Sequence, residues 1–197
     1  MTIERPRAPL AAVDIARLAA LHIRALPGSL IAKLGPRYTG AFYAHCAASP
    51  YETLHVARDA GGQILAACLV SERPGDLGAR LRRATPLVAA AAAHPGAWLE
   101  LIRAALAAPG SPPAPQIVTL FADEAARGRG HGAALVEAAA RMSAPSLYAV
   151  TEDDPENRAF EFYRKTGFRD AGTTRLNGRV FRLLARGTAP GSGPCAA

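Results

Sequence analysis

Three glycines alternate with cationic and polar residues in the short run Arg127-Gly128-Arg129-Gly130-His131-Gly132. An apolar segment at 116–122, typical of a buried strand, precedes the run, and an apolar helical pattern at 133–142 follows it. Glycines let the backbone approach a ligand closely, and the free amides and dipole of a helix N-terminus favour an anion. This order of elements therefore predicts a pyrophosphate site, to which Arg127 and Arg129 would add charge-assisted contacts.

The surroundings of these glycines exclude two common nucleotide motifs. No Lys-Ser or Lys-Thr pair follows them, as a P-loop requires, and the run stands too late and too isolated for a dinucleotide fold. ATP and NAD are therefore not the expected ligands. An arginine-glycine run can also be a flexible nucleic-acid-binding segment, although ordered elements on both sides favour a fixed loop.

Composition narrows the class of protein further. The chain has 197 residues, enough for one domain, and half of them are apolar while a fifth are charged, as in a globular protein. No membrane span is expected, and Cys46, Cys68 and Cys195 stand too far apart for a disulfide framework or a zinc site. We therefore expect a cytoplasmic protein without metal. The net charge of +7 favours anionic partners, which include nucleic acid, a membrane surface and a phosphorylated small molecule.

The hydrophobic pattern changes period several times along the first half of the chain. It predicts a strand at 2–5, a helix from an Asp14 cap to Pro27, a helix from Pro36 to Ser49, and a hairpin of strands at 53–58 and 63–70. Residues 71–115 are rich in alanine and are predicted to be helical, and we interpret them as an inserted helical pair.

The second half of the chain predicts further short elements after the glycine run. These are a strand at 147–151, a helix that Asp154-Pro155 caps and Gly167 ends, and strands at 168–174 and 179–185. Asn177-Gly178 joins the last two strands and suits a type I′ hairpin turn. The Gly-, Pro- and Ala-rich end of the chain has no periodicity and is predicted to be a flexible tail.

Two spaced sets of residues together carry a family resemblance. Arg127, Gly130 and Gly132 fit the pattern Arg/Gln-x-x-Gly-x-Gly/Ala. An alanine four residues before a tyrosine, followed by Gly-Phe, is found at Ala159, Tyr163, Gly167 and Phe168. In both patterns the sequence resembles the GNAT superfamily of acetyl-CoA-dependent N-acetyltransferases, and the resemblance is firm over 116–168.

The resemblance implies a fold and a domain organisation. The expected fold class is α/β (α+β), with a mixed, mostly antiparallel sheet of six to seven strands flanked by helices. A V-shaped splay is expected between the fourth and fifth strands. One acetyltransferase domain would cover 1–186, with a helical insert at 72–115 between the third and fourth strands, and 187–197 would be the tail.

The resemblance also implies an activity and a set of site residues. The enzyme would transfer an acetyl group from acetyl-CoA to a primary amine of a small molecule, for instance an amino sugar, or of a peptide, by direct attack in a ternary complex. Tyr163 would be the general acid, and an amide near Ala122 would polarise the thioester carbonyl. The residues expected to bind the cofactor are Leu120, Phe121, Ala122, Arg127, Gly128, Arg129, Gly130, His131, Gly132, Ala133, Asn157, Phe160 and Tyr163.

The sequence departs from the family pattern at two positions. Histone-type relatives place a glutamate on the fourth strand where this chain has Gln116, which cannot accept a proton. The asparagine usual before the second pattern falls on Glu156, with Asn157 one place later. The acidic residues at 152–156 would attract a cationic amine or supply a base, or they would cap a helix.

Two further functions stay open at this point. Arg80, Arg82 and Arg83, with the net charge, raise the possibility of acetylating an RNA-linked or protein amine. The absence of a carboxylate on the fourth strand raises that of a non-catalytic acyl-CoA-binding module. Nucleic acid is not the expected partner, and a homodimer is left open.

Overall fold

The computed structural model describes residues 1–92, 113–143, 145–154, 157–176 and 179–187. Within these residues the strands form one seven-stranded sheet in the order β1-β2-β3-β4-β5-β7-β6. The strands are β1 (Thr2–Glu4), β2 (Glu52–Arg58), β3 (Ile64–Ser71), β4 (Gln116–Ala122), β5 (Ser146–Glu152), β6 (Arg169–Leu176) and β7 (Arg179–Gly187). All neighbours pair antiparallel except β4 and β5, which confirms the predicted mixed sheet.

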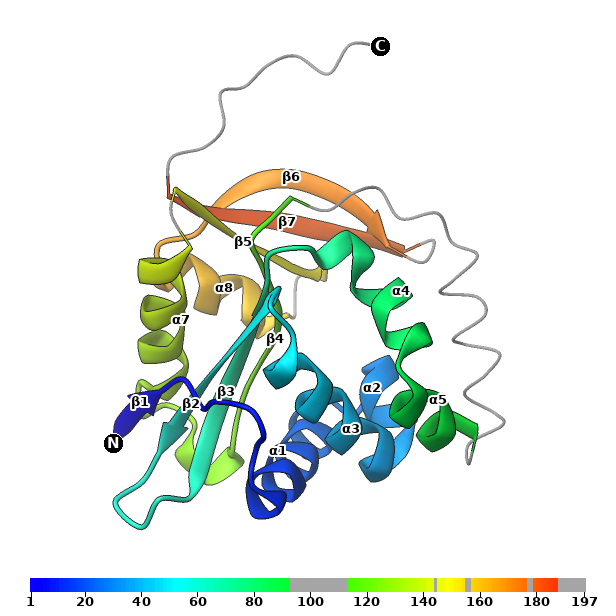
Figure 1. Cartoon of the computed structure of the whole chain (residues 1–197). Helices are drawn as coiled ribbons and strands as arrows, with labels where there is room; N and C mark the ends of the chain where they lie inside the picture. Colours follow the sequence, from blue (N-terminus) through cyan, green and yellow to red (C-terminus); the bar gives the residue numbers. More distant parts are fainter. Residues whose placement is uncertain (93–112, 144, 155–156, 177–178, 188–197) are drawn as a thin grey trace.

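Helices cover both faces of this sheet (Figure 1). The helical elements are α1 (Ala12–Ala25), α2 (Leu30–Lys33), α3 (Gly35–Ala48), α4 (Pro74–Arg83), α5 (Thr85–Ala92), the 3-10 turn η1 (Glu124–Ala126), α7 (His131–Met142) and α8 (Arg158–Lys165). No helix among the described residues is long and apolar enough to cross a membrane.

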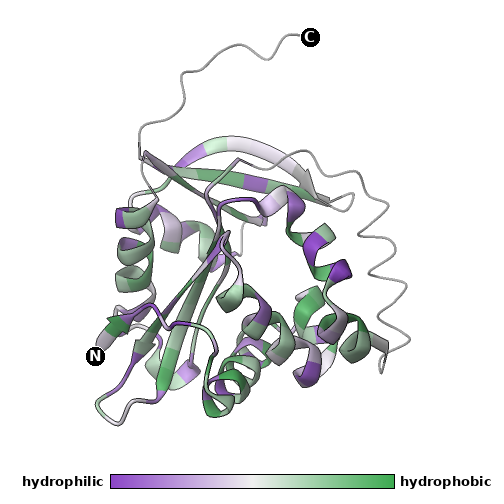
Figure 2. Ribbon diagram, in the orientation of Figure 1, coloured by the Kyte–Doolittle hydropathy of each residue, from purple (hydrophilic) through white to green (hydrophobic). Residues whose placement is uncertain are grey.

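The core consists of two apolar clusters, one on each side of the sheet. The first joins helices α1, α3 and α5 to the sheet through residues such as Leu18, Phe42 and Phe121. The second joins α7 and α8 to the opposite face through residues such as Leu135 and Tyr163. Figure 2 shows the apolar residues concentrated on the central strands, with hydrophilic residues along α4.

The junction between β4 and β5 is short. Only Gln116 with Tyr148 and Ile117 with Ala149 are paired there, although each strand has seven residues. The Tyr148 amide also donates to the carbonyl oxygen of Pro115 at 2.9 Å. Beyond Ile117, the edge of β4 that faces β5 has no strand partner within the described residues, as the predicted splay requires.

Helix starts differ from two of the predictions. Helix α1 begins after Ala11 without a side-chain cap, and the carboxylate of Asp14 instead binds the guanidinium of Arg58 at 2.7 and 2.8 Å. Helix α8 is capped by Asn157, whose side-chain oxygen accepts a hydrogen bond from the Ala159 amide, and not by Asp154. For Asp14 the partner lies 44 residues away in the sequence, beyond the reach of a local capping pattern.

Other expectations fall partly outside the described residues. Helices α4 and α5 occupy the first part of the predicted insert, and 93–112 lie outside the description. The predicted turn at 177–178, Glu156 and the tail from 188 onward also lie outside it. The four-residue helix α2 was not predicted.

Candidate active site

A cavity of about 720 Å³ lies between the end of α1, the second half of β4, the start of α7 and helix α8. It is lined by Ala25, Leu26, Leu120, Phe121, Ala122, Ala126, Arg127, Gly128, Gly130, His131, Gly132, Ala133, Arg158, Ala159, Phe162, Tyr163, Lys165 and Thr166. The structure therefore brings together most of the residues expected from the sequence to bind the cofactor.

The glycine run forms the floor where α7 begins. Gly128 and Gly130 adopt φ angles of 75° and 82°, in the left-handed region that glycine tolerates without a Cβ penalty. Gly130 is the N-cap, and its carbonyl accepts the first helical hydrogen bond from Ala134. The amides of residues 131–133 have no intrahelical partner, so they present hydrogen-bond donors and the positive end of the helix dipole to the cavity.

Gly132 brings α7 close to α8. A Cβ atom at this position would lie 3.2 Å from Cε2 and Cζ of Phe162. Such a contact is too tight without movement of the aromatic ring. The third glycine therefore serves helix packing at the cavity, and Phe162, which was not among the site residues expected from the sequence, lines it.

Cationic side chains lie at the cavity wall. Arg127, Arg158 and Lys165 are among the lining residues, whereas Arg129 is exposed and outside the lining. Arg158 and Lys165 come from α8 and were not expected from the sequence. The charge of the wall complements a polyanionic ligand.

Tyr163 is buried on α8 and lines the same cavity. Its ring makes edge contacts with Phe162 and Phe168, at centroid distances of 5.4 and 5.1 Å. Burial raises the pKa of the Tyr163 hydroxyl, and the neighbouring Cys68 adds to this shift. The hydroxyl is therefore protonated at neutral pH, as a proton donor must be.

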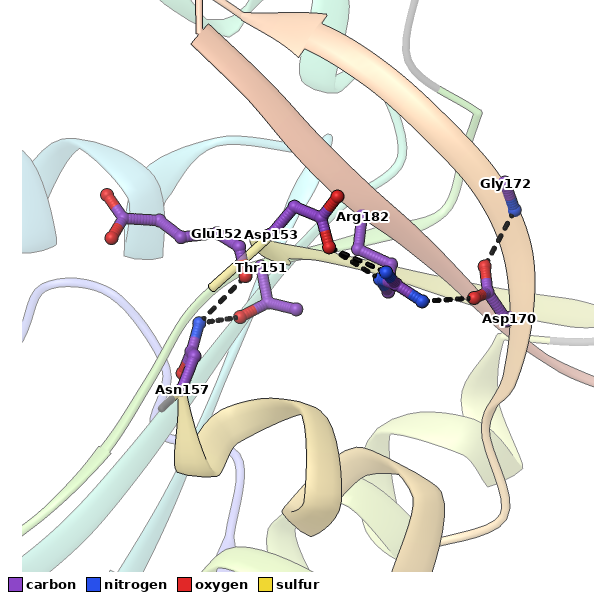
Figure 3. A network of polar contacts seen from close by, with 7 residues as sticks. All are labelled: Thr151, Glu152, Asp153, Asn157, Asp170, Gly172 and Arg182. Atoms are coloured by element: carbon purple, nitrogen blue, oxygen red, sulfur yellow. Dashed lines mark hydrogen bonds and ion pairs between the residues drawn. The ribbon is translucent and has the colours of Figure 1, made fainter. Parts of the chain in front are cut away.

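Asn157 and Phe160 lie outside the cavity lining. The side-chain amide of Asn157 donates to Thr151 Oγ1 at 2.7 Å and to the backbone carbonyl of Glu152 at 3.0 Å. These bonds fix the start of α8 to the end of β5 (Figure 3). The Phe160 ring lies under the Arg182 guanidinium, 5.0 Å from its centroid. Their predicted contacts with the cofactor stay predictions.

The acidic residues after β5 have structural partners. Asp153 accepts hydrogen bonds from Arg182 at 2.6 and 2.9 Å, and Arg182 also binds Asp170 (Figure 3). The backbone carbonyl of Asp154 accepts a hydrogen bond from the backbone amide of Asn157. The Asp153 contacts favour a strand-linking role for this carboxylate over a role as the base, whereas the predicted helix cap is supplied by Asn157.

A polar chain on the opposite face of β4 was not anticipated. The two ring nitrogens of His22 contact the hydroxyls of Tyr43 at 2.6 Å and Ser29 at 2.8 Å. The Tyr43 hydroxyl in turn lies 3.4 Å from Thr119 Oγ1 on β4. Burial lowers the pKa of His22 to about 4, so its imidazole is neutral at physiological pH. No sequence pattern joins these residues, because they come from α1, the start of α2, α3 and β4.

A mixed sheet that separates beyond a short parallel junction, with a glycine-rich helix start and a protonated tyrosine beside the gap, defines an acetyltransferase of the GNAT type. Residues 50–170 match the family described as Acetyltransferase (GNAT) domain, which is more than half of the chain. The protein thus belongs to the GNAT acetyltransferase family. No curated protein sequence is significantly similar to it.

Solved structures share the fold over nearly the whole chain. The aminoglycoside 6'-acetyltransferase type Ii has a TM-score of 0.62 and 15% identity, covering 96% of this chain and 99% of that one. An aminoglycoside 6'-N-acetyltransferase complexed with coenzyme A has a TM-score of 0.61 and 14% identity, covering 94% and 96%. The histone acetyltransferase HPA2 and related acetyltransferase from Corynebacterium glutamicum ATCC 13032 has a TM-score of 0.61 and 19% identity, covering 99% and 98%.

Proposed function

We propose that this acetyltransferase moves the acetyl group of acetyl-CoA to a primary amine of a small molecule, by direct attack in a ternary complex. The observation that carries the proposal is the cavity itself. It joins the helix start of α7, the unpaired edge of β4 and the hydroxyl-bearing residue Tyr163 within one space.

The residues at one end of the cavity fit a diphosphate. The amides of 131–133 and the left-handed glycines Gly128 and Gly130 form a backbone cradle, and Arg127, Arg158 and Lys165 add positive charge. A Cβ at Gly132 would disturb this packing. The residues present are therefore suited to hold the phosphate end of coenzyme A.

The free edge of β4 fits the amide-containing arm of the same molecule. The Asp123 amide donates to the Leu65 carbonyl on β3 at 2.7 Å. Because successive amides of a strand point to opposite edges, the amide of Ala122 points away from β3, toward the gap beside β5. A fixed donor at Ala122 that meets the thioester carbonyl oxygen as negative charge develops would stabilise the transition state by roughly 3 kcal/mol.

Acetyl-CoA supplies an activated acyl carbon, so a carbon–nitrogen bond forms to the amine while the carbon–sulfur bond breaks. Tyr163 donates its hydroxyl proton to the departing sulfur, and the proton lost by the amine nitrogen passes to solvent and restores the hydroxyl. The burial that keeps Tyr163 protonated also excludes water from the reacting groups.

Calorimetry and an assay of thiol release test this function. We expect acetyl-CoA to bind with one site per chain, and free thiol to appear only when an amine acceptor is added. If acetyl-CoA gives no heat of binding, the assignment of the cavity is wrong. If it binds and no primary amine in a broad panel releases thiol, the proposed reaction is wrong.

A further inference from the structure

The cavity described above reaches both faces of the sheet. Ala25 and Leu26, at the end of α1, line it and pack against the first apolar cluster. Ala159 and Phe162, on α8, line it and pack against the second cluster, on the opposite face. The cavity therefore continues from the α8 face to the α1 face at the second half of β4, beyond the short pairing of this strand with β5.

The two ends of the cavity differ in chemistry. At the α7–α8 end, cationic side chains and the free amides of the helix start suit the phosphates of coenzyme A. At the α1 end, an apolar wall consists of Ala25, Leu26 and Phe121. Ala25 and Leu26 are partly exposed, so they keep apolar surface open to a ligand. Phe121 directly precedes Ala122, whose amide would meet the thioester carbonyl, so the apolar wall borders the reacting carbon.

Hydrogen bonds on both sides of Leu26 hold the apolar wall in place. The backbone amide of Leu26 donates to the His22 carbonyl at 2.8 Å, and its carbonyl accepts from the Ser29 amide at 3.0 Å. The His22 ring contacts Ser29 Oγ at 2.8 Å and packs edge-on against Phe121, with centroids 5.5 Å apart. Because the wall is fixed before a ligand arrives, little entropy is lost when one binds.

Within the described chain, every charged residue that lines the cavity is cationic. The carboxylate of Asp123, which directly follows β4, binds the guanidinium of Arg17 at 2.6 Å and lies 3.5 Å from that of Arg24. An ammonium group that leaves water without meeting an opposite charge carries a large free-energy cost. The α1 end of the cavity therefore disfavours an acceptor with a second positive charge.

We propose that the apolar wall is the acceptor subsite, and that it takes a primary monoamine whose body is a hydrocarbon chain or ring. This assignment rests on the acetyltransferase function proposed above and specifies its substrate class. The hydrocarbon body packs on Leu26 and Phe121 while the amine nitrogen reaches the thioester carbon beside Ala122. The wall binds and orients the amine, and none of its residues exchanges a proton. Since Tyr163 belongs to the cluster on the opposite face, the amine and the proton donor act from the two sides of the thioester.

Three acceptors test the substrate class on the unmodified protein. Hexylamine and 1,6-diaminohexane have the same carbon chain and differ only in the charge at its far end, and kanamycin carries several ammonium groups. We expect kcat/KM at one pH to be highest for hexylamine and at least about tenfold lower for the other two. A smaller difference or the reverse order would overturn the substrate class.

Two variants of similar size test the wall. Leu26→Asn and Leu26→Asp both remove apolar surface, and only the second adds a negative charge. We expect both to raise the KM for hexylamine about tenfold, and Leu26→Asp alone to raise kcat/KM for 1,6-diaminohexane, by at least about threefold. The Kd of acetyl-CoA stays within about twofold, because Leu26 lies on the face opposite the phosphate end. Val13→Asp, at an exposed position of α1 outside the lining, is the control and leaves these constants unchanged.

The outcomes separate the two proposals. Loss of acetyl-CoA binding by the unmodified protein, or no thiol release with any amine, refutes the proposed function. Normal turnover with an unchanged KM for hexylamine in Leu26→Asn refutes the subsite alone.

Two further results would assign the wall to the cofactor and contradict the proposal. One is a Kd of acetyl-CoA that rises as much as the KM for hexylamine. The other is a changed preference between acetyl-CoA and butyryl-CoA, which would mean that the wall holds the acyl chain. Thermal unfolding shows whether each variant folds, and the comparison of acceptors on the unmodified protein decides the question if neither Leu26 variant does.

Discussion

The carboxylate of Asp123 accepts a hydrogen bond from the guanidinium of Arg17 at 2.6 Å, which ties helix α1 to the residue that follows β4. Arg17 also donates to the Ile64 carbonyl at 2.9 Å, and Arg24 lies 3.5 Å from the same carboxylate. The end of α1 contributes Ala25 and Leu26 to the cavity. This ion pair therefore holds one wall of the cavity in place.

Asp123→Asn weakens this tie. We expect the free energy of unfolding to fall by about 1–2 kcal/mol, because a charge-assisted bond becomes a neutral one, and the Kd of acetyl-CoA to rise a few-fold, by about 0.5–1 kcal/mol. Urea unfolding and calorimetry measure the two effects. Asp76→Asn, on the exposed side of α4, is the control. Equal stability of the two variants would contradict a role for the Arg17 contact.

Gly132→Ala places a methyl group against Phe162. We expect the Kd of acetyl-CoA to rise about five- to tenfold, or about 1 kcal/mol, because the ring or the start of α7 has to move. Phe162→Leu removes the two ring atoms concerned, so the double variant Gly132→Ala/Phe162→Leu recovers most of the affinity lost. A purely additive double variant would show that the two positions are not coupled.

Arg127 and Arg129 differ in position and allow a matched comparison. Arg127 lines the cavity and Arg129 does not. We expect Arg127→Gln to raise the Kd of acetyl-CoA about three- to tenfold at low salt, with a smaller difference at high salt, because a charged contact is lost. Arg129→Gln is expected to bind nearly as the unmodified protein does. If calorimetric titrations show that Arg129→Gln weakens acetyl-CoA binding more than Arg127→Gln does, the predicted contact belongs to Arg129.

Tyr163→Phe removes the proposed proton donor and keeps the ring contacts with Phe162 and Phe168. We expect kcat to fall by about 10²-fold or more while acetyl-CoA affinity is retained, because the hydroxyl acts on the departing sulfur. Tyr38→Phe, which removes a buried hydroxyl on α3, is the control and keeps its kcat. A Tyr163→Phe enzyme with full activity would assign the proton to another donor.

His22 makes stability depend on pH. Burial lowers its pKa from 6.5 to about 4, so between these values the unfolded chain binds a proton that the folded chain does not. The stabilising contribution of the neutral imidazole is therefore complete above pH 6.5 and falls by up to about 3 kcal/mol as the pH drops to 4. His22→Gln should unfold with a shallower pH dependence than the unmodified protein in this window. Identical slopes in urea unfolding at pH 4.5–7.0 would exclude this role.

Local sequence patterns predicted the elements with local causes. The bounds of β4, Gln116–Ala122, follow from an apolar run that Pro115 precedes and a polar loop follows, and the glycine run marked the start of α7. The prediction that Asp14 caps α1 was wrong because the partner of its carboxylate, Arg58, is 44 residues away. Side-chain contacts across such distances depend on how the elements pack, which a single sequence does not encode locally.

The site shows the same division between local and long-range causes. Phe160 and Phe162 are two residues apart on α8 and point to different surroundings, one under Arg182 and the other into the cavity. Their spacing could not say which of them faces the ligand. Which side chains share a face of the sheet depends in the same way on strand register, as for Glu52, Ser71 and Gln116, which are opposed on β2, β3 and β4.

The short junction of β4 and β5 divides the sheet into two parts. One part consists of β1 to β4 and the other of β5, β7 and β6, and two residue pairs connect them. We expect local opening of backbone hydrogen bonds to be largest at this connection. A cofactor bound in the gap would form hydrogen bonds with the free edge of β4 and hold the two parts together. Its binding would therefore slow amide exchange along β4 and raise the melting temperature of the protein.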